Sequence, residues 1–98
     1  MNIEQYLLTC LGEEGVEIAH SASKANRFGL DDVWPGKPTT NRTDLVAEFN
    51  DLVAVMELLQ ANGILSNAPL IDRDKVEAKK DKLSRMMVYS ASRGRVKV

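Results

Sequence analysis

Residues 43–61 read TDLVAEFNDLVAVMELLQA, and this stretch decides the fold. Its apolar residues recur at helical spacing and cover a wide arc of the helix surface: Leu45, Val46, Phe49, Leu52, Val53, Val55, Met56, Leu58 and Leu59. A helix at the surface of a globular protein needs only one apolar stripe. We therefore predict a central helix with several neighbours, capped by Asn41 or Thr43 and ended by Asn62-Gly63.

A first helix is predicted before this central one. It begins with Asn2 as its cap and ends at Phe28, where Gly29 supplies a left-handed stop. The segment that follows, LDDVWPGKPTTNR, is predicted to be a loop, because Pro35-Gly36 suits the two central positions of a type II turn.

A last helix is predicted to open at Asp72 or Asp74, with an Asp-x-x-Glu capping box at its start, and to run to about Tyr89. No stretch shows the period-2 alternation of a strand, so the predicted fold class is all-α. The predicted organisation is a helical domain over residues 1–90 and a basic, flexible tail over residues 91–98.

Composition restricts the class of protein. The chain has 98 residues, which is one domain's worth, and so short a chain buries only a modest share of its surface alone, so we expect an oligomer. No apolar run approaches the roughly 18 residues that would span a membrane. The acidic N-terminal stretch lacks the basic start of a secretory signal, so we expect a cytoplasmic protein without membrane association. The single cysteine, Cys10, is expected to be a buried small hydrophobe.

The net charge of −1 hides an asymmetry along the chain. Residues 1–72 carry 11 acids against 4 bases, whereas residues 73–98 carry 3 acids against 9 bases. Two complementary solvated halves are the simplest interpretation of this pattern. The alternative is one anionic ligand, held through cations on the acidic side and directly by the basic side.

The first helix contains an unusual run of charge, GEEGVE, in which two glycines enclose two of three acids. Residues three and four apart are neighbours on a helix, so Glu13 and Glu14 each lie one turn from Glu17. Glycine in a helix interior costs about 1 kcal/mol relative to alanine. We interpret Gly12 and Gly15 as points where a neighbouring helix or a ligand approaches closely.

The central helix also carries two acids one turn apart: in EFND, Glu48 and Asp51 stand among apolar residues. Two like charges about 4 Å apart repel by about 4 kcal/mol at an effective dielectric of 20. Protons or cations would relieve that repulsion. Because carboxylates are hard oxygen donors, the donor set favours Mg²⁺, or Mn²⁺ in its place, and Mg²⁺ readily bridges substrate phosphates.

The motif EExxE at residues 13–17 followed by ExxD at residues 48–51 resembles the signature of the all-α nucleoside triphosphate pyrophosphohydrolases. That superfamily includes MazG, the dimeric dUTP pyrophosphatases and phosphoribosyl-ATP pyrophosphohydrolase. The resemblance covers roughly residues 3–89 and implies a MazG-like helical bundle completed by formation of a homodimer or homotetramer. It also implies Mg²⁺-dependent hydrolysis of a nucleotide between its α and β phosphates, which releases a monophosphate and pyrophosphate.

The resemblance assigns roles to the five acids. Glu14, Glu17, Glu48 and Asp51 correspond to the metal ligands. Glu13 fills the first motif place as an extra ligand, an outer partner or a residue that orients water. One of the three acids of the first helix would accept the proton of the attacking water.

The spacing departs from the family pattern. Thirty residues separate Glu17 from Glu48, slightly more than is usual in the family, and the extra length falls in the loop over residues 31–41. This loop is expected to form a lid or a substrate wall.

Six further residues are candidates for substrate binding: Lys24, Trp34, Asn50, Lys79, Lys82 and Arg85. Lys24 is placed two turns beyond Glu17 and would reach a phosphate, and an ordinary salt bridge is the alternative. The three basic residues of the last helix resemble phosphate contacts of the family, or form a solvated face. Trp34 would stack on a base or belong to a core or interface. His20 is expected to be a structural or surface histidine and not a ligand.

The sequence thus predicts a small Mg²⁺-dependent nucleotide pyrophosphohydrolase. The alternative from another class is a non-catalytic regulatory module whose basic residues 73–98 bind nucleic acid. No helix-turn-helix is evident and the aromatic residues are scattered, so nucleic acid is the less favoured partner.

Overall fold

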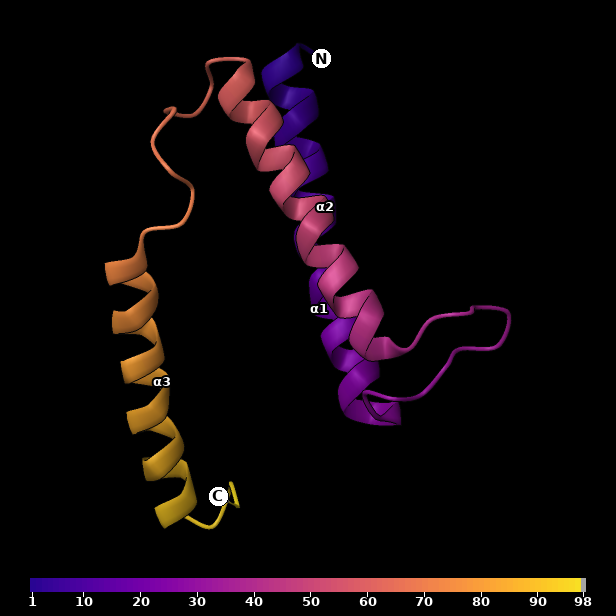
Figure 1. Ribbon diagram of the computed structural model, residues 1–98, viewed down its shortest axis with the longest axis vertical. Helices are drawn as coiled ribbons and strands as arrows, with labels where there is room; N and C mark the ends of the chain where they lie inside the picture. Colours follow the sequence, from indigo (N-terminus) through magenta and orange to yellow (C-terminus); the bar gives the residue numbers. More distant parts are fainter. Residues whose placement is uncertain (98) are drawn as a thin grey trace. The chain divides into compact units, whose positions relative to one another are not determined.

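The structure, a computed structural model, describes residues 1–97 and is helical throughout its regular elements (Figure 1). Its three helices are α1 (Ile3–Phe28), α2 (Asn41–Ala61) and α3 (Arg73–Ser92). Within residues 1–97 the only extended pairing is an isolated bridge between Val33 and Thr40. The predicted all-α class is confirmed, and none of the three helices is both long and apolar enough to cross a membrane.

The N-terminal cap of α1 forms as predicted. The Asn2 side chain accepts the Gln5 backbone N–H at 2.8 Å, and the Asn2 N–H donates to the Gln5 side chain at 2.9 Å. This reciprocal pair satisfies two donors that the first turn would otherwise leave open. At the other end Gly29 follows Phe28 with a φ of 99° and a ψ of 149°, and this positive φ, which favours glycine, ends α1 at the predicted residue.

The start of α2 differs from its prediction. Thr40 caps the helix, because its hydroxyl accepts the Thr43 N–H at 3.2 Å, and neither Asn41 nor Thr43 is the cap. The side chain of Asn41 serves another contact, which ties it to the end of α1. The predicted end of α2 is confirmed, with Asn62 at the C-cap and Gly63 at a φ of 71°.

Asp72 caps α3 and accepts the backbone N–H groups of Asp74 and Lys75. The predicted Asp-x-x-Glu box is wrong, because the helix starts at Arg73 and Glu77 lies one turn further in, where it pairs with Arg73 at 2.8 Å. Helix α3 also continues to Ser92, beyond the predicted end near Tyr89. Of the tail predicted over residues 91–98, the last residue lies outside the described part.

The chain divides into two compact units, Met1–Asn67 and Ala68–Val98. In the first unit α1 and α2 pack antiparallel as a hairpin (Figure 1). Its buried apolar residues are Leu7, Ala25 and Leu59, and Cys10 is half-buried where full burial was expected. A core of this size is small for a chain of 98 residues.

The loop between α1 and α2 contains the predicted turn. The Lys37 N–H donates to the Trp34 carbonyl at 3.0 Å, and Gly36 has a φ of 86°. A type II turn needs positive φ at its third position, which glycine adopts without steric cost. Pro35-Gly36 therefore reverses the chain as predicted.

Asn41 joins the two ends of this loop. It is only 4% exposed, and its side-chain amide donates to the Gly29 carbonyl at 2.9 Å. Its backbone N–H donates to the Asp32 carbonyl at 3.0 Å, and the next N–H, of Arg42, donates to Leu30 at 2.8 Å. These bonds connect the last residues of α1 to the first turn of α2, so they set how the two helices align.

We predict that Asn41→Ala lowers the free energy of unfolding by about 1–3 kcal/mol, because the Gly29 carbonyl loses its partner in a part-buried position. Urea denaturation followed by circular dichroism measures this change. Asn26→Ala, in the exposed surface of α1, is the matched control and is expected to change stability by less than about 0.5 kcal/mol. Equal losses in the two variants would show that the amide does not hold the hairpin.

Candidate metal centre

Three carboxylates from two separate motifs meet on the α1–α2 hairpin. Glu14 comes from α1, and Glu48 and Asp51 come from α2. One oxygen from each lies within 4.8 Å of the others. Glu48 and Asp51 are three residues apart, which places them on one face of their helix, and the antiparallel packing of α1 brings Glu14 to that face.

The carboxylates of this acidic triad affect the pKa of Glu14. Glu14 and Glu48 are half-buried, and Asp51 is exposed. Partial removal of Glu14 from water raises its pKa above the ordinary 4.5, and the neighbouring charges of Asp51, Glu48, Glu17 and Glu13 raise it further, in that order. The raised pKa of Glu14 therefore reflects its partial removal from water first and the surrounding negative charge second.

The triad fits a small hard cation. Mg²⁺ binds oxygen at about 2.0–2.1 Å, so two ligands on opposite sides of one ion are about 4.1 Å apart. The carboxylate oxygens, within 4.8 Å of one another, would need to move inward by less than about 1 Å to reach that geometry. All three donors are oxygens, which suits Mg²⁺ or Mn²⁺ better than zinc. A bound divalent cation would also neutralise most of the repulsion.

Of the EExxE motif only Glu14 joins the triad. Glu13 and Glu17 are exposed side chains of α1 and are not part of the group whose oxygens converge. Both still act on the site, because their charges contribute to the raised pKa of Glu14. The structure thus brings together three of the four predicted ligands and places Glu17 one turn away.

The glycines of GEEGVE have open surroundings. A Cβ added at Gly12 or at Gly15 would meet no atom within 4 Å. No neighbouring helix of the described chain approaches closely at these positions, so the interpretation that these glycines accommodate a packed helix is wrong for the described chain. Any close approach would have to come from a ligand or a second copy.

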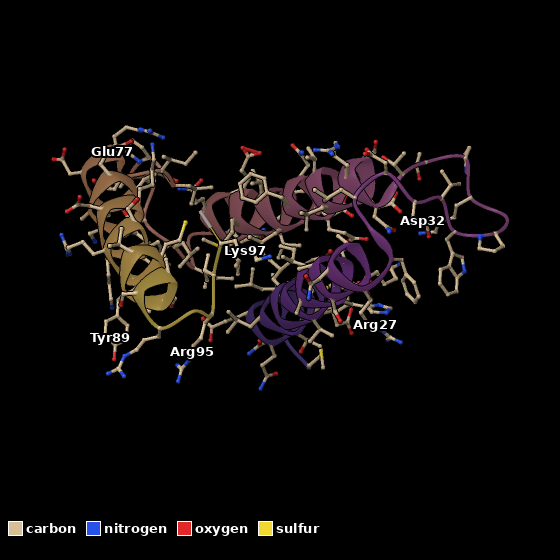
Figure 2. The ribbon with its side chains drawn as sticks, turned by 90° about the horizontal axis from the view of Figure 1, so that it is seen from below. Arg27, Asp32, Glu77, Tyr89, Arg95 and Lys97 are labelled. Atoms are coloured by element: carbon tan, nitrogen blue, oxygen red, sulfur yellow. The ribbon has the colours of Figure 1, made fainter. Side chains whose placement is uncertain are left out.

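Lys24 and Trp34 are brought together by the loop. The Lys24 ammonium lies 5.6 Å from the centre of the Trp34 ring, and Phe28 packs edge-on against the same ring at 6.0 Å. Arg27 lies over the Phe28 ring at 5.0 Å (Figure 2). The alternative of a salt bridge for Lys24 is not formed within residues 1–97. The contact between Lys24 and Trp34 was not predicted, because it depends on how the loop folds back on α1.

The remaining predicted substrate residues are exposed. The Asn50 amide donates to the Val46 carbonyl one turn earlier at 2.8 Å. On α3, Lys79 and Lys82 are exposed and Arg85 pairs with Asp81 at 2.5 Å. His20 is exposed and is not one of the converging metal-ligand candidates.

Comparison of the chain with models of protein families, with curated proteins and with solved structures gives no match. The functional conclusion therefore rests on the residues and their geometry.

We predict that Glu14 makes the metal-free protein more stable at lower pH. Because its pKa is raised in the folded state, the folded protein binds this proton more tightly than the unfolded chain. The stabilisation is complete below the unfolded pKa, near 4.5, and is lost as the pH rises through the raised folded value. Relative to Glu14→Gln, the wild type should gain stability as the pH falls from about 7 to about 5.

Urea denaturation in EDTA over this pH range measures the difference. Glu57→Gln, which removes an exposed acid of α2 outside the triad, is the matched control and should keep the wild-type pH dependence. The crowding of charge at Glu14 is disproved if Glu14→Gln and the wild type show the same dependence.

Proposed function

We propose that the protein is a Mg²⁺-dependent nucleotide pyrophosphohydrolase that cleaves nucleoside triphosphates or related nucleotides between the α and β phosphates. The observation that carries this proposal is the convergence of Glu14, Glu48 and Asp51 from two motifs that lie far apart in the sequence. Three acids that merely served solubility would have no reason to share one site, since their mutual repulsion destabilises the fold.

The resemblance of EExxE and ExxD to the all-α pyrophosphohydrolases supports the same reaction. It connects the acids to a defined chemistry, in which hard cations and a polyphosphate occupy one site. The arrangement on two antiparallel helices is compatible with that chemistry.

In the proposed reaction a water molecule attacks the α-phosphorus, the bond between this phosphorus and the bridging oxygen breaks, and pyrophosphate leaves. Glu14, Glu48 and Asp51 would hold a Mg²⁺ ion through their carboxylate oxygens. Such an ion would neutralise charge on the phosphates and lower the pKa of a bound water. Glu13, Glu14 or Glu17 would accept the proton of the attacking water.

The proposed substrate contacts are Lys24, Trp34, Asn50, Lys79, Lys82 and Arg85. Lys24 is ten residues beyond Glu14 on α1, which corresponds to about 15 Å along the helix axis. It is therefore proposed as a contact for a part of the substrate away from the reacting phosphorus. Lys79, Lys82 and Arg85 of α3 are proposed as phosphate contacts because they resemble basic residues of the family.

The proposed assembly is a homodimer or homotetramer that completes the helical bundle. Helix α2 exposes Val46, Phe49 and Leu58 by half or more of their surface, and α1 exposes Tyr6 and Val16 more than half. Apolar surface of this extent on neighbouring helices is typical of a face that packs against another chain.

A nucleic-acid-binding module remains the second candidate, and the positive charge of α3 favours it. Residues 73–98 hold nine basic residues against three acidic ones. Binding to nucleic acid through phosphates falls steeply with salt, whereas hydrolysis of a nucleotide depends chiefly on Mg²⁺. Measuring both activities across a salt series separates the two functions.

We predict that Glu48→Gln and Asp51→Asn abolish pyrophosphate release from a nucleotide panel in the presence of Mg²⁺. The amides nearly preserve shape but remove the charge that holds a hard cation. Mg²⁺ should raise the melting temperature of the wild type and leave that of both variants unchanged. Glu57→Gln is the control on the same helix and should keep both activity and the Mg²⁺ effect. Full activity in the Glu48 and Asp51 variants would overturn the metal assignment.

We also predict that the protein is an oligomer at micromolar concentration. The apolar residues on α1 and α2 should be covered by a second copy, because three helices leave part of α2 in water. Size-exclusion chromatography with light scattering measures the mass, and Leu58→Asp should shift it toward the monomer by burying a charge in the interface. A stable, well-folded monomer would mean that the bundle closes within one chain.

A further inference from the structure

A hollow lies along one face of α3 and is separate in sequence from the acidic triad. Its volume is about 420 Å³, and it is lined by Lys82, Arg85, Met86, Tyr89, Ser90 and Arg95. The first five of these residues recur at intervals of three and four, so they form one stripe along the helix. The sixth comes from the segment after the helix.

A turn brings Arg95 to this stripe. Gly94 has a φ of 73°, and the Arg95 N–H donates to the Ser90 carbonyl at 2.9 Å. The N–H of Gly94 donates to the Ala91 carbonyl at 3.0 Å. This pattern of bonds around a glycine of positive φ folds the chain back over the last turn of a helix. Arg95 is therefore held at the hollow by local backbone bonds within a tail that the sequence predicted to be flexible.

The lining of the hollow carries charge of one sign. Lys82, Arg85 and Arg95 are cations, and no acid lines the hollow. Arg85 shares its guanidinium with Asp81 at 2.5 Å, whereas Lys82 and Arg95 form no ion pair within residues 1–97. The C-terminal end of a helix repels anions, so an anionic ligand here needs several cations to offset the helix dipole.

The middle of the stripe is apolar and aromatic. Met86 is 52% exposed and Tyr89 is 58% exposed. Figure 2 labels Tyr89 and Arg95, and Arg93 lies 5.3 Å from the centre of the Tyr89 ring. An arginine placed over an aromatic ring stabilises it as a platform for stacking. A ligand that uses the whole lining therefore has negative charge and one flat ring.

We propose that this hollow binds the phosphates and the base of a nucleotide, with Arg95 as a phosphate contact and Tyr89 as the stacking partner. The proposal rests on the proposed function, in which Lys82 and Arg85 contact substrate phosphates, and it adds two residues to that set. The volume lies within the range of small-molecule sites, about 300–1,000 Å³. Single-stranded nucleic acid is less suited, because proteins bind it by stacking successive bases and this lining has one aromatic ring.

Binding to the full chain in EDTA tests this proposal, because it separates the hollow from metal-dependent chemistry. Isothermal titration with ATP, tripolyphosphate and adenosine distinguishes the contributions of charge and ring. We expect Arg95→Ala to weaken ATP and tripolyphosphate binding by about tenfold, as loss of a charge-assisted contact does. Tyr89→Leu should weaken ATP binding by about tenfold and leave tripolyphosphate unchanged, as loss of one stacked base does.

Lys97→Ala is the matched control, because it removes a cation of the same tail that does not line the hollow. It should change ATP affinity by less than about twofold, which is within the small effect of an exposed charge. Equal effects of Arg95→Ala and Lys97→Ala would overturn the proposal, as would tripolyphosphate and ATP responding alike to Tyr89→Leu. Much tighter binding of an oligothymidine than of ATP would overturn it in favour of nucleic acid.

Two results keep this inference apart from the proposed function. The double variant Glu48→Gln/Asp51→Asn, which removes two negative charges, should bind ATP in EDTA at least as tightly as the wild type, and loss of binding in that variant would place the ligand elsewhere. A chain that hydrolyses nucleotides with Mg²⁺ but whose ATP affinity in EDTA does not respond to Arg95→Ala contradicts only the hollow. A chain that binds ATP through Arg95 without hydrolysing it contradicts only the reaction.

Discussion

The buried amide of Asn41 is the interaction on which the α1–α2 hairpin depends. Its side chain donates to the last turn of α1 through Gly29, while its backbone and that of Arg42 bond the loop at Asp32 and Leu30. Two antiparallel helices can slide past each other by a turn with little change in apolar contact, whereas hydrogen bonds at the connection permit one alignment. That alignment places the middle of α1 opposite the middle of α2, where the acids are.

Repulsion within the acidic triad then destabilises the hairpin. Glu14 is half-buried beside two other carboxylates, and its raised pKa shows that the charged form is disfavoured. Protons relieve that cost at low pH, and the proposed divalent cation would relieve it at neutral pH in competition with protons. A site destabilised in this way is typical of functional centres, where the ligand supplies the missing stabilisation.

The buried core of the hairpin is small, and apolar side chains of α2 are left exposed. Only Leu7, Ala25 and Leu59 are buried apolar residues within residues 1–97, whereas Val46, Phe49 and Leu58 of α2 are exposed by half or more. A hairpin of two helices has no interior of its own beyond the line where the helices touch. The exposed apolar positions of α2 are therefore available for a further helix, and the proposed assembly supplies one.

The sequence by itself determined the helices and most of their ends, because these depend on local rules of periodicity, capping and turns. Asn2 and Gln5, the Pro35-Gly36 turn and the Asn62-Gly63 stop follow from side chains within a few residues of each other. It also identified the five acids of the two motifs, since like charges among apolar residues are visible in the letters alone. Only the tertiary structure decided which acids meet: Glu14 joins Glu48 and Asp51, while Glu17 stays one turn away. The cap of α2 moved to Thr40 for the same reason, because Asn41 is used by a contact twelve residues distant in sequence. Such contacts depend on how two helices align, and no local pattern in the chain encodes that alignment.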